Sequence, residues 1–376
     1  MSTFEIKGIN FDNHGAAMML LSVRERLGGE HRLAVEAAGD YDVRAPYGLH
    51  QILRRAGGVP LNPLVASVPR RLRGRVGLII DSEIDAVLDA SGFAYGDDWG
   101  AAKIHKRLDA ALVRRQRTGM PVILLPQAMG PFNKPEVRNA FARVVDQASL
   151  IYVRDASTQA YVEEAFGTRD NVRRCPDFTI GLQGLRDPRH ARLTGRPAIV
   201  PNHMVVRNAD AATRSLYVDL LASSAAAARD AFGEPFVALH DARQDAALAA
   251  ELSERLGTVE MVAEHRPQVM KGILADSAVV VGSRFHALVA ALSHGTPVIA
   301  FGWSHKYAEL LTDFGCPEAL VKVEPGAEAE VRTLMEKIVA DRPALSARLQ
   351  SRAAELKAKV VGMWDEVALT VQGTAR

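Results

Sequence analysis

The sequence predicts an α/β protein with two doubly wound, parallel-sheet domains that face each other across a cleft. Short apolar runs alternate with helical patterns along most of the chain, which is typical of parallel sheets wrapped by helices. The chain has 376 residues, a length that suits two hydrophobic cores better than one. A polar stretch rich in Gly, Pro and Arg, residues 181–197, separates two sets of these elements.

The first set lies within residues 1–182 and forms the predicted N-terminal, Rossmann-like domain. Short apolar runs predict its strands, and longer runs with helical spacing of apolar residues predict its helices. Strands are expected at 3–9, 32–36, 76–80, 121–126, 150–153 and 171–174. Helices are expected at 15–28, 102–119, 135–147 and 156–167.

The second set follows a predicted linker at 183–197 and forms a C-terminal, Rossmann-like domain over 198–345. Its first strands are expected at 198–201 and 235–240, and its first helices at 210–232, 243–256 and 266–275. Helical patterning resumes at 341–372. Residues 346–376 are therefore expected to form a helical segment that packs back on the domains.

A strand, a tight turn and a helix are predicted at the start of segment 277–311, SAVVVGSRFHALVAALSHGTPVIAFGWSHKYAELL. Residues 277–281 form a short apolar run with three valines, as in a buried parallel strand. Gly282 breaks the run, Ser283 suits an N-cap, and helix formers follow at 287–292.

Basic side chains and a histidine follow the strands of this segment. Arg284 and His286 fall in the first turn of the predicted helix, where backbone N–H groups and the macrodipole favour an anion. Lys306 lies in the loop after the next strand, 298–301, so it is expected at the same edge of the sheet. A lone arginine or histidine at a strand end is commonly structural, but the combination indicates a place where an anionic group is held and protonated.

This segment resembles the C-terminal signature of the polysaccharide pyruvyl transferases, which has a Ser-Arg-(apolar)-His motif, a Gly-x-Pro strand and a downstream lysine. Four further blocks resemble the same family in the same order: 10–27, 122–132, 151–167 and 175–182. Together the blocks span about residues 8–312. The chain departs from the family pattern at Ala16 and Ala17, where a more polar pair is expected.

The resemblance implies phosphoenolpyruvate as donor and a sugar of a surface-polysaccharide precursor as acceptor, with a pyruvate ketal formed and phosphate released. No cofactor or metal is expected, because the sequence lacks the corresponding motifs, and the two facing domains resemble the GT-B arrangement of glycosyltransferases. His286 has the chemistry of the acid that protonates the enolpyruvate. The positions implied to bind the donor are Arg154, Ser283, Arg284 and Lys306. For Arg154, a structural salt bridge with Asp155 or Glu163 is the alternative.

Candidate acceptor contacts are polar or glycine residues in loops that follow strands. The candidates are Asn13, His14, Gly15, Asp97, Asp98, Trp99, His203 and Arg207. Asp97 and Asp98 have two alternative interpretations, as ligands of a magnesium ion or as caps of the helix that begins near Trp99. The acceptor itself is expected to be linked to a lipid diphosphate or to a nucleotide.

Several other classes of protein have no support in the sequence. No G-x-G-x-x-G follows the first strand, and no P-loop or H-E-x-x-H motif occurs. Cys175 and Cys316 lie far apart without metal-ligand spacing, which favours a reducing cytoplasm. No apolar run is long enough to cross a bilayer, and residues 1–10 lack a signal-peptide core.

The net charge of +2 hides a basic stretch. Residues 43–80 contain seven arginines, interspersed leucines and valines, and no Asp or Glu. Two interpretations stay open: an ordinary solvated surface, or a surface that approaches anionic lipid headgroups or a diphosphate-linked acceptor at the inner face of the cytoplasmic membrane. Nucleic-acid binding is disfavoured because the stretch has only one aromatic residue, Tyr47.

Two other functions remain as alternatives to a pyruvyl transferase. A GT-B glycosyltransferase that uses a nucleotide sugar would hold a donor phosphate at the same helix N-terminus, so the fold does not separate the two. A binding subunit without turnover is the third hypothesis. The retained His286 and the cationic residues argue against it.

Overall fold

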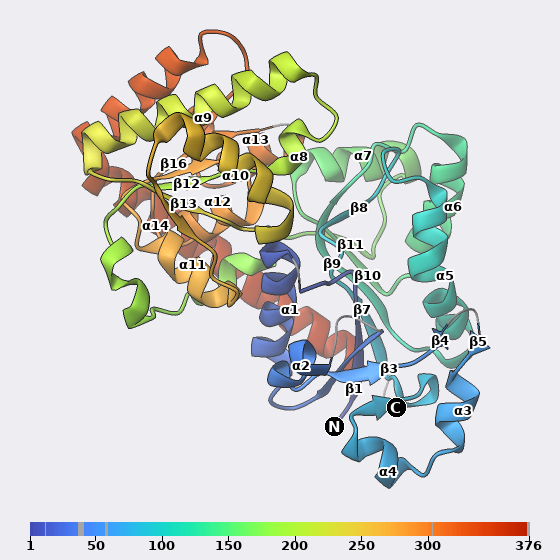
Figure 1. Ribbon diagram of the computed structural model, residues 1–376. Coiled ribbons are helices and arrows are strands. Elements are labelled where there is room, and N and C mark those ends of the chain that lie inside the picture. The colour runs from blue at the N-terminus through green and yellow to red at the C-terminus, as the bar shows by residue number, and fades with distance from the viewer. Residues whose placement is uncertain (12, 37–40, 57–58, 303, 374–376) are drawn as a thin grey trace. The chain divides into compact units, whose positions relative to one another are not determined.

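The computed structural model describes residues 1–11, 13–36, 41–56, 59–302 and 304–373, which divide into two compact units (Figure 1). Unit 1 comprises Met1–Phe11, Met19–Phe178 and Lys359–Arg376. Unit 2 comprises Asp12–Met18 and Thr179–Ala358. Both are α/β units with parallel sheets, as the alternation of elements predicts.

Unit 1 is built on a parallel sheet in the order β11-β10-β9-β7-β1-β2-β3-β6. Its strands are β1 (Thr3–Lys7), β2 (Arg32–Glu36), β3 (His50–Ile52), β6 (Leu78–Ile79), β7 (Ala86–Asp89), β9 (Val122–Met129), β10 (Leu150–Val153) and β11 (Val172–Arg174). A short strand, β8 (Phe93–Tyr95), pairs with β9. The sequence-based prediction lacks β3, β7 and β8, although β7 is fully buried and lies in the middle of the sheet.

Helices cover both faces of the unit 1 sheet. The main ones are α1 (His14–Leu27), α5 (Ala101–Thr118), α6 (Pro135–Gln147) and α7 (Ala156–Phe166). On β10, Ile151 and Val153 pack into the core with α5 and α6. Tyr152 points to the opposite face, where its hydroxyl donates to Glu366 Oε2 (2.6 Å) in the last helix. This alternation is the pattern of a strand buried on both sides.

Unit 2 has the parallel strand order β14-β13-β12-β15-β16-β17. The strands are β12 (Ala198–Val200), β13 (Phe236–Ala238), β14 (Glu260–Val262), β15 (Val280–Gly282), β16 (Val298–Phe301) and β17 (Leu320–Val321). The chain runs outward from β12 through β13 and β14, then crosses back to β15 beside β12. This Rossmann-like order places a topological switch point between β12 and β15, and ligands of such sheets bind at the carboxyl ends of the strands there.

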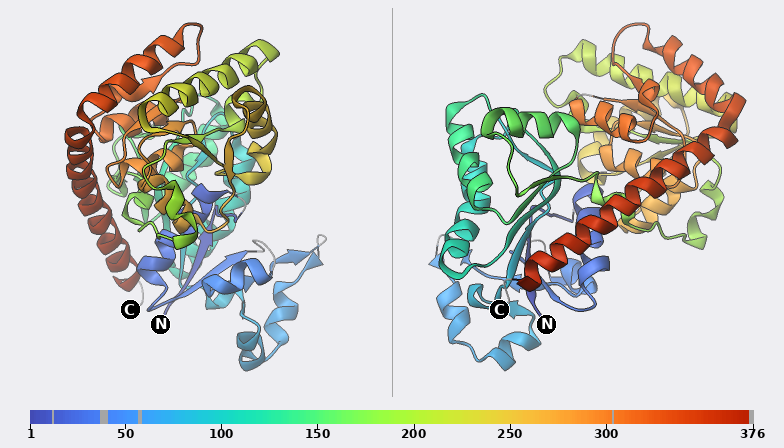
Figure 2. Two further views of the ribbon diagram at one scale, coloured as in Figure 1. Left: turned by 60° about the vertical axis from the view of Figure 1, so that its left-hand side comes forward. Right: turned by 180° about the vertical axis from the view of Figure 1, so that it is seen from behind.

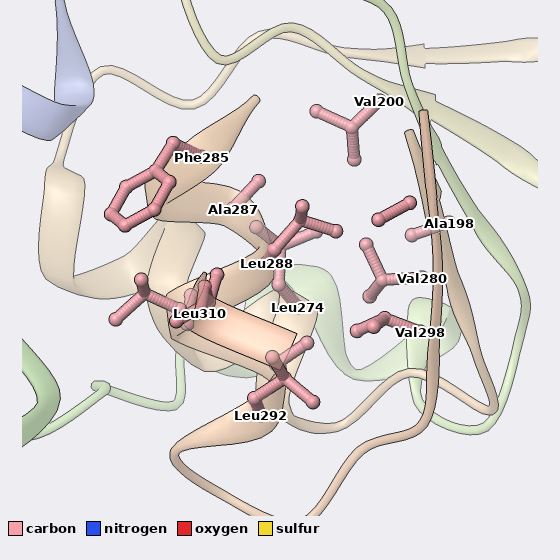
Figure 3. Close-up of a cluster of buried hydrophobic side chains, with 14 of the residues drawn as sticks. Ala198, Val200, Leu274, Val280, Phe285, Ala287, Leu288, Leu292, Val298 and Leu310 are labelled. Carbon is pink, nitrogen blue, oxygen red and sulfur yellow. The ribbon is translucent and has the colours of Figure 1, made fainter. Parts of the chain in front are cut away.

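Two helical layers enclose the unit 2 sheet. One face packs on α9 (Ala211–Phe232) and α10 (Ala242–Leu256), and the other on α11 (Pro267–Ala275), α12 (Phe285–Leu292) and α13 (His305–Asp313). Figure 3 shows the second face, where Val280 and Val298 of the sheet lie opposite Leu288 of α12. The neighbouring Val281 belongs to the core on the other face, as the strand period requires.

The final helix, α14 (Ala327–Gly373), is bent (Figure 2). The bend falls at Asp341, whose backbone is non-helical, two residues before Pro343. The helix begins earlier than the predicted C-terminal segment, so residues 327–340 complete the unit 2 core and only the end of the helix belongs to unit 1. None of the described helices is long and apolar enough to cross a membrane.

Candidate active site

The ends of β12 and β15 are joined by a buried hydrogen-bond network at the switch point of unit 2. The Asn202 side chain donates to the Ser283 carbonyl (2.6 Å). The Tyr217 hydroxyl donates to Ser283 Oγ (2.8 Å), and the Tyr307 hydroxyl donates to the Ser283 carbonyl (2.6 Å). Ser283 therefore fixes the loop, and its hydroxyl already accepts a hydrogen bond from a neighbouring core residue.

The predicted start of α12 needs a correction. The helix begins at Phe285 with Arg284 as its N-cap, whereas the sequence suggests that Ser283 caps it. The Ser283 hydroxyl is directed to Tyr217 and does not cap. Gly282 does not break the strand as predicted, because β15 extends to Gly282, where it pairs with Val200 of β12. A Cβ at Gly282 would lie 2.2 Å from the Val200 carbonyl oxygen, so glycine permits the close approach of the two strands.

Asp245, in the first turn of α10, is the centre of the polar network. Its side chain is fully buried and accepts hydrogen bonds from Arg284 Nε (2.9 Å) and from Arg284 Nη2. It also accepts from the backbone N–H groups of His203 (3.0 Å) and Asp241 (3.2 Å). One carboxylate thus ties together the chain segments that leave β12, β13 and β15. The sequence analysis did not single out Asp245.

Arg284 is nearly buried and is committed in part to this internal ion pair. Asp245 engages the Nε and Nη2 edge of the guanidinium, and Nη1 takes no part in these two hydrogen bonds. A guanidinium held in this way does not present the same edge to an anion as a two-pronged donor. A ligand contact by Arg284 would therefore have to use Nη1.

The ring of His286 packs against the first turn of α1. A Cβ at Gly15 would lie 2.3 Å from His286 Nδ1 and 2.9 Å from Cγ, so only glycine permits this approach. The Nδ1 side of the ring is thus against backbone, and Nε2 is on the opposite side of the imidazole. Gly15, which the sequence analysis treats as a candidate acceptor contact, positions this histidine.

Lys306 lies in the first turn of α13, next to the same loop. Its ammonium is 5.5 Å from the centre of the Phe285 ring and 5.4 Å from that of the Tyr307 ring. The two rings are themselves 6.0 Å apart. These cation–π contacts bring Lys306 beside the start of α12. Arg284 and Lys306 follow the neighbouring strands β15 and β16, and the convergence of Lys306 with Arg284 and His286 on one ligand stays a prediction.

Two buried histidines adjoin this group. The His14 and His240 rings are 5.1 Å apart, and the His14 backbone N–H donates to the His240 carbonyl (3.4 Å). Burial, reinforced by His265, lowers the pKa of His14 to about 4, although Asp241 and Glu264 oppose the shift. Burial lowers the pKa of His240 well below its usual value, with His14, Arg284 and His286 adding to the effect. Neither ring nitrogen of His240 has a hydrogen-bond partner among the described residues.

Helix N-termini add to the positive potential of this region. Asn13 Oδ1 accepts from the Gly15 (2.8 Å) and Ala16 (3.3 Å) N–H groups at the start of α1, and Asp241 caps α10. Helices α12 and α13 begin without a side-chain cap hydrogen bond. The N-terminus of a helix and its macrodipole favour an anion.

The other two acceptor candidates in unit 2, His203 and Arg207, take less part in this network of side chains. The backbone N–H of His203 is held by Asp245, and its side chain is half-buried. Arg207 is exposed at the C-terminal end of α8 (His203–Val206). No group of three or more His, Cys, Asp or Glu side chains in the described part of the chain could hold a metal ion.

Arg154 belongs to unit 1, where it follows β10. Its side chain is buried and donates through Nη1 to Asp177 Oδ2 (3.2 Å), with Asp155 Oδ2 at 3.9 Å from Nε. Asp155, one of the two partners that the sequence suggests, is thus at ion-pair distance, but the carboxylate that accepts the hydrogen bond is that of Asp177, which the sequence analysis does not name. Asp155 also caps α7 by accepting from the Thr158 N–H (2.7 Å).

The Asp97–Trp99 loop of unit 1 has a structural role that differs from the predicted one. Asp97 accepts from the backbone N–H groups of Asn133 (2.9 Å) and Lys134 (3.1 Å), just before α6. The helix near Trp99 is α5, whose N-cap is Gly100. Asp98 is exposed. Lys103 Nζ lies over the Trp99 ring, 3.6 Å from the ring centre, in a cation–π contact.

The model of the family described as polysaccharide pyruvyl transferase matches residues 13–305, which is more than half of the chain. The amylovoran biosynthesis protein AmsJ of Erwinia amylovora is 22% identical over 263 residues, covering 64% of this chain. The match spans 62% of the length of AmsJ.

Solved structures with a similar fold include glycosyltransferase-like proteins. HepE of Anabaena, in complex with UDP and glucose, has a TM-score of 0.60 at 13% identity and covers 99% of both chains. The glycotransferase of kitacinnamycin has a TM-score of 0.52 at 15% identity and covers 98% of both chains. At these identities the likeness concerns the fold, which is GT-B-like.

Replacing Asp245 with Asn should destabilise the protein strongly, because the buried Arg284 guanidinium loses its hydrogen-bonded counter-ion and, among the described residues, keeps only the more distant carboxylate of Asp241, at 4.0 Å. The expected loss is about 3–5 kcal/mol of unfolding free energy, measured by urea denaturation. The double variant Asp245→Leu, Arg284→Met removes both charges and should recover part of that loss, because the backbone N–H groups of His203 and Asp241 still lose their acceptor. Equal stability of Asp245→Asn and the wild type would show that the carboxylate is not the anchor.

Stability should fall on acidification because the fold keeps His14 and His240 neutral. The unfolded chain protonates both rings below about pH 6.5, so each contributes a loss of up to about 1.4 kcal/mol per pH unit between there and its lower folded-state pKa. Thermal unfolding at about pH 7 and about pH 5 should show a smaller acid loss for His240→Phe than for the wild type. His105→Gln, which changes an exposed ring, is the matched control. Identical acid losses in all three proteins would contradict this assignment.

Proposed function

The chain belongs to the polysaccharide pyruvyl transferase family, and we propose that it forms a cyclic pyruvate ketal on a sugar, with phosphoenolpyruvate as donor. The observation that carries this proposal is the meeting of His286 and Arg284 at the N-terminus of α12, at the switch point of unit 2. A proton donor and an anion-binding helix end are the two features that an enolpyruvate donor needs.

The proposed reaction begins with a proton transfer from His286 Nε2 to the methylene carbon of phosphoenolpyruvate. The carbon that bears the phosphate becomes electrophilic, and a sugar hydroxyl oxygen bonds to it and returns a proton to His286. Phosphate then leaves with the electron pair of its C–O bond, and a second hydroxyl oxygen of the sugar bonds to the same carbon, closes the ketal and gives its proton to the released phosphate. The contact of Nδ1 with Gly15 supports Nε2 as the donating nitrogen, because the Nδ1 side is against backbone.

We propose that the donor anion is held by Lys306, by Nη1 of Arg284 and by the N-termini of α12 and α13. Arg154 is the fourth candidate, with its side chain already paired to Asp177. Phosphate and carboxylate groups bind cationic side chains through charge-assisted hydrogen bonds. His14 and His240 add hydrogen-bonding capacity without adding charge at neutral pH.

The proposed acceptor is a sugar of an exopolysaccharide precursor. Its support is the likeness to AmsJ, a protein of amylovoran biosynthesis. His14 and Arg207 are acceptor candidates in unit 2, and Asp98 and Trp99 are candidates in unit 1. Asn13, Gly15 and Asp97 are also acceptor candidates. Each has a structural role that does not depend on a sugar, because Asn13 and Asp97 accept backbone hydrogen bonds and Gly15 packs against His286.

Changing His286 to Gln should abolish turnover and leave donor binding in place, because the lost group acts on the transition state. We expect phosphate release to fall at least about 100-fold, with the product detected by its mass gain of pyruvate minus water on glycosides that carry two neighbouring free hydroxyls. His105→Gln should keep wild-type activity. If His286→Gln retained most of the activity, the acid would be another group.

Phosphoenolpyruvate should raise the melting temperature, because a ligand that binds only the folded state stabilises it. Lys306→Gln should weaken binding by about 1.5–3 kcal/mol, measured by calorimetry. Lys337→Gln, a change of an exposed lysine on α14, should not. Donor binding unchanged in Lys306→Gln would remove Lys306 from the site.

A glycosyltransferase that uses a nucleotide sugar is the second candidate, favoured by the likeness to HepE in complex with UDP and glucose. The same thermal measurement separates the two functions. Stabilisation by UDP-, GDP- or ADP-sugars without stabilisation by phosphoenolpyruvate would support the glycosyltransferase and overturn the ketal-forming reaction.

A further inference from the structure

One surface of unit 1 combines exposed arginines with exposed aliphatic side chains. It is formed by the strand pair β4 (Arg55–Ala56) and β5 (Val59–Pro60) and by the short helices α3 (Asn62–Ser67) and α4 (Arg70–Arg75), and is called here the α3–α4 surface. We propose that the α3–α4 surface binds the anionic headgroups of a lipid bilayer. This inference does not depend on the proposed reaction.

The α3–α4 surface is an insertion at the end of the unit 1 sheet. Its elements lie in the chain between β3 and β6, and β6 is the outermost strand. In both views of Figure 2 the two helices, in light blue, lie at one end of unit 1. The exposed apolar side chains of this insertion are needed neither for the candidate site in unit 2 nor for the main core of unit 1.

Helix α4 buries an arginine and exposes a leucine. Arg73 is 5% exposed and donates to Glu83 Oε2 (2.5 Å) and to the Val68 carbonyl (3.0 Å). The adjacent Leu72 is 51% exposed. In water, burial of the leucine and exposure of the arginine would be the favoured arrangement. The helix is thus oriented with apolar surface outward.

The exposed aliphatic side chains are clustered. Five of the thirteen exposed large hydrophobic residues in the described chain fall within residues 59–76. They are Val59, Leu64, Val68, Leu72 and Val76, and their exposure ranges from 40% to 61%. Scattered exposed leucines are ordinary, but a cluster marks a contact surface.

The charge of the same surface is positive. Arg55, Arg70, Arg71 and Arg75 are exposed, and residues 43–80 contain no Asp or Glu. The nearest acidic side chains, Asp81 and Glu83, pair with Arg54, Arg73 and Arg70. Among the described residues, no ion pair is formed by Arg55, Arg71 or Arg75. Arg44, Arg54 and Arg73 turn inward, so only part of the arginine-rich stretch is a surface.

This combination fits an anionic bilayer better than other partners. Arginines are attracted to acidic headgroups, and neighbouring aliphatic side chains enter the boundary between headgroups and acyl chains. Nucleic-acid surfaces commonly stack bases on aromatic rings, and residues 55–76 contain no aromatic residue. A second copy of the chain would bring like charges together.

Co-sedimentation of the full chain with vesicles tests the proposal. The wild type should sediment with vesicles of phosphatidylcholine and phosphatidylglycerol at low salt, much less at high salt, and not with phosphatidylcholine alone. The triple variant Arg55→Gln, Arg71→Gln, Arg75→Gln keeps the inward arginines and should bind about 100-fold more weakly, since each basic residue contributes about fivefold. Arg117→Gln, Arg332→Gln, Arg348→Gln makes the same charge change elsewhere and should bind as the wild type does.

A fluorescence measurement reports the apolar contact separately. The emission of Leu72→Trp should shift to shorter wavelength with the anionic vesicles, whereas that of Val113→Trp, at an exposed position on α5, should not. Thermal scans establish that each variant is folded. The proposal is overturned if the wild type does not sediment, if both triple variants bind equally, or if the surface arginines matter for binding a polynucleotide and not for binding vesicles.

Discussion

The buried carboxylate of Asp245 is the constraint on which the candidate site depends. A charged group without water must be paired and hydrogen-bonded, and Asp245 meets this need with Arg284 and two backbone N–H groups. Those partners follow three different strands of unit 2, so one ion pair sets the mutual positions of the loops that surround His286. The same ion pair occupies one edge of the Arg284 guanidinium, which limits how that residue can meet an anion.

Burial also determines which side chains of the candidate site carry a charge. His14 and His240 are cationic in water at mildly acidic pH, yet inside unit 2 they are neutral because hydration is lost. The positive potential for an anion therefore comes from Lys306, from Arg284 and from helix N-termini, whose dipoles are fixed in direction. Buried neutral imidazoles remain able to form hydrogen bonds with a bound ligand.

Local patterns in the sequence were sufficient to predict much of the fold. Apolar runs separated by helical patterns gave β2, β10 and α6 with the bounds that the structure has. The pattern of residues 277–311 likewise predicted that Arg284, His286 and Lys306 follow the carboxyl ends of neighbouring strands. The central strand β7 was missed because it is short and ends in the buried Asp89, whose charge interrupts the apolar run.

Contacts between distant residues could not be predicted from spacing. Tyr217 meets Ser283 across 66 positions, and Asp245 meets Arg284 across 39. Gly15 and His286 come from opposite ends of the matched region, and only the three-dimensional packing shows that the glycine is needed for the ring.

Prediction from the sequence is limited in the same way for the arginine-rich stretch, residues 43–80, because composition does not tell which arginines turn inward. Arg73 and Leu72 are neighbours with opposite surroundings: the charged side chain is buried against Glu83, and the apolar one is in water. Leu72 is 51% exposed, and this contact of apolar surface with water costs free energy. A surface that accepts both aliphatic side chains and arginines would recover it, and an anionic bilayer has these two properties together.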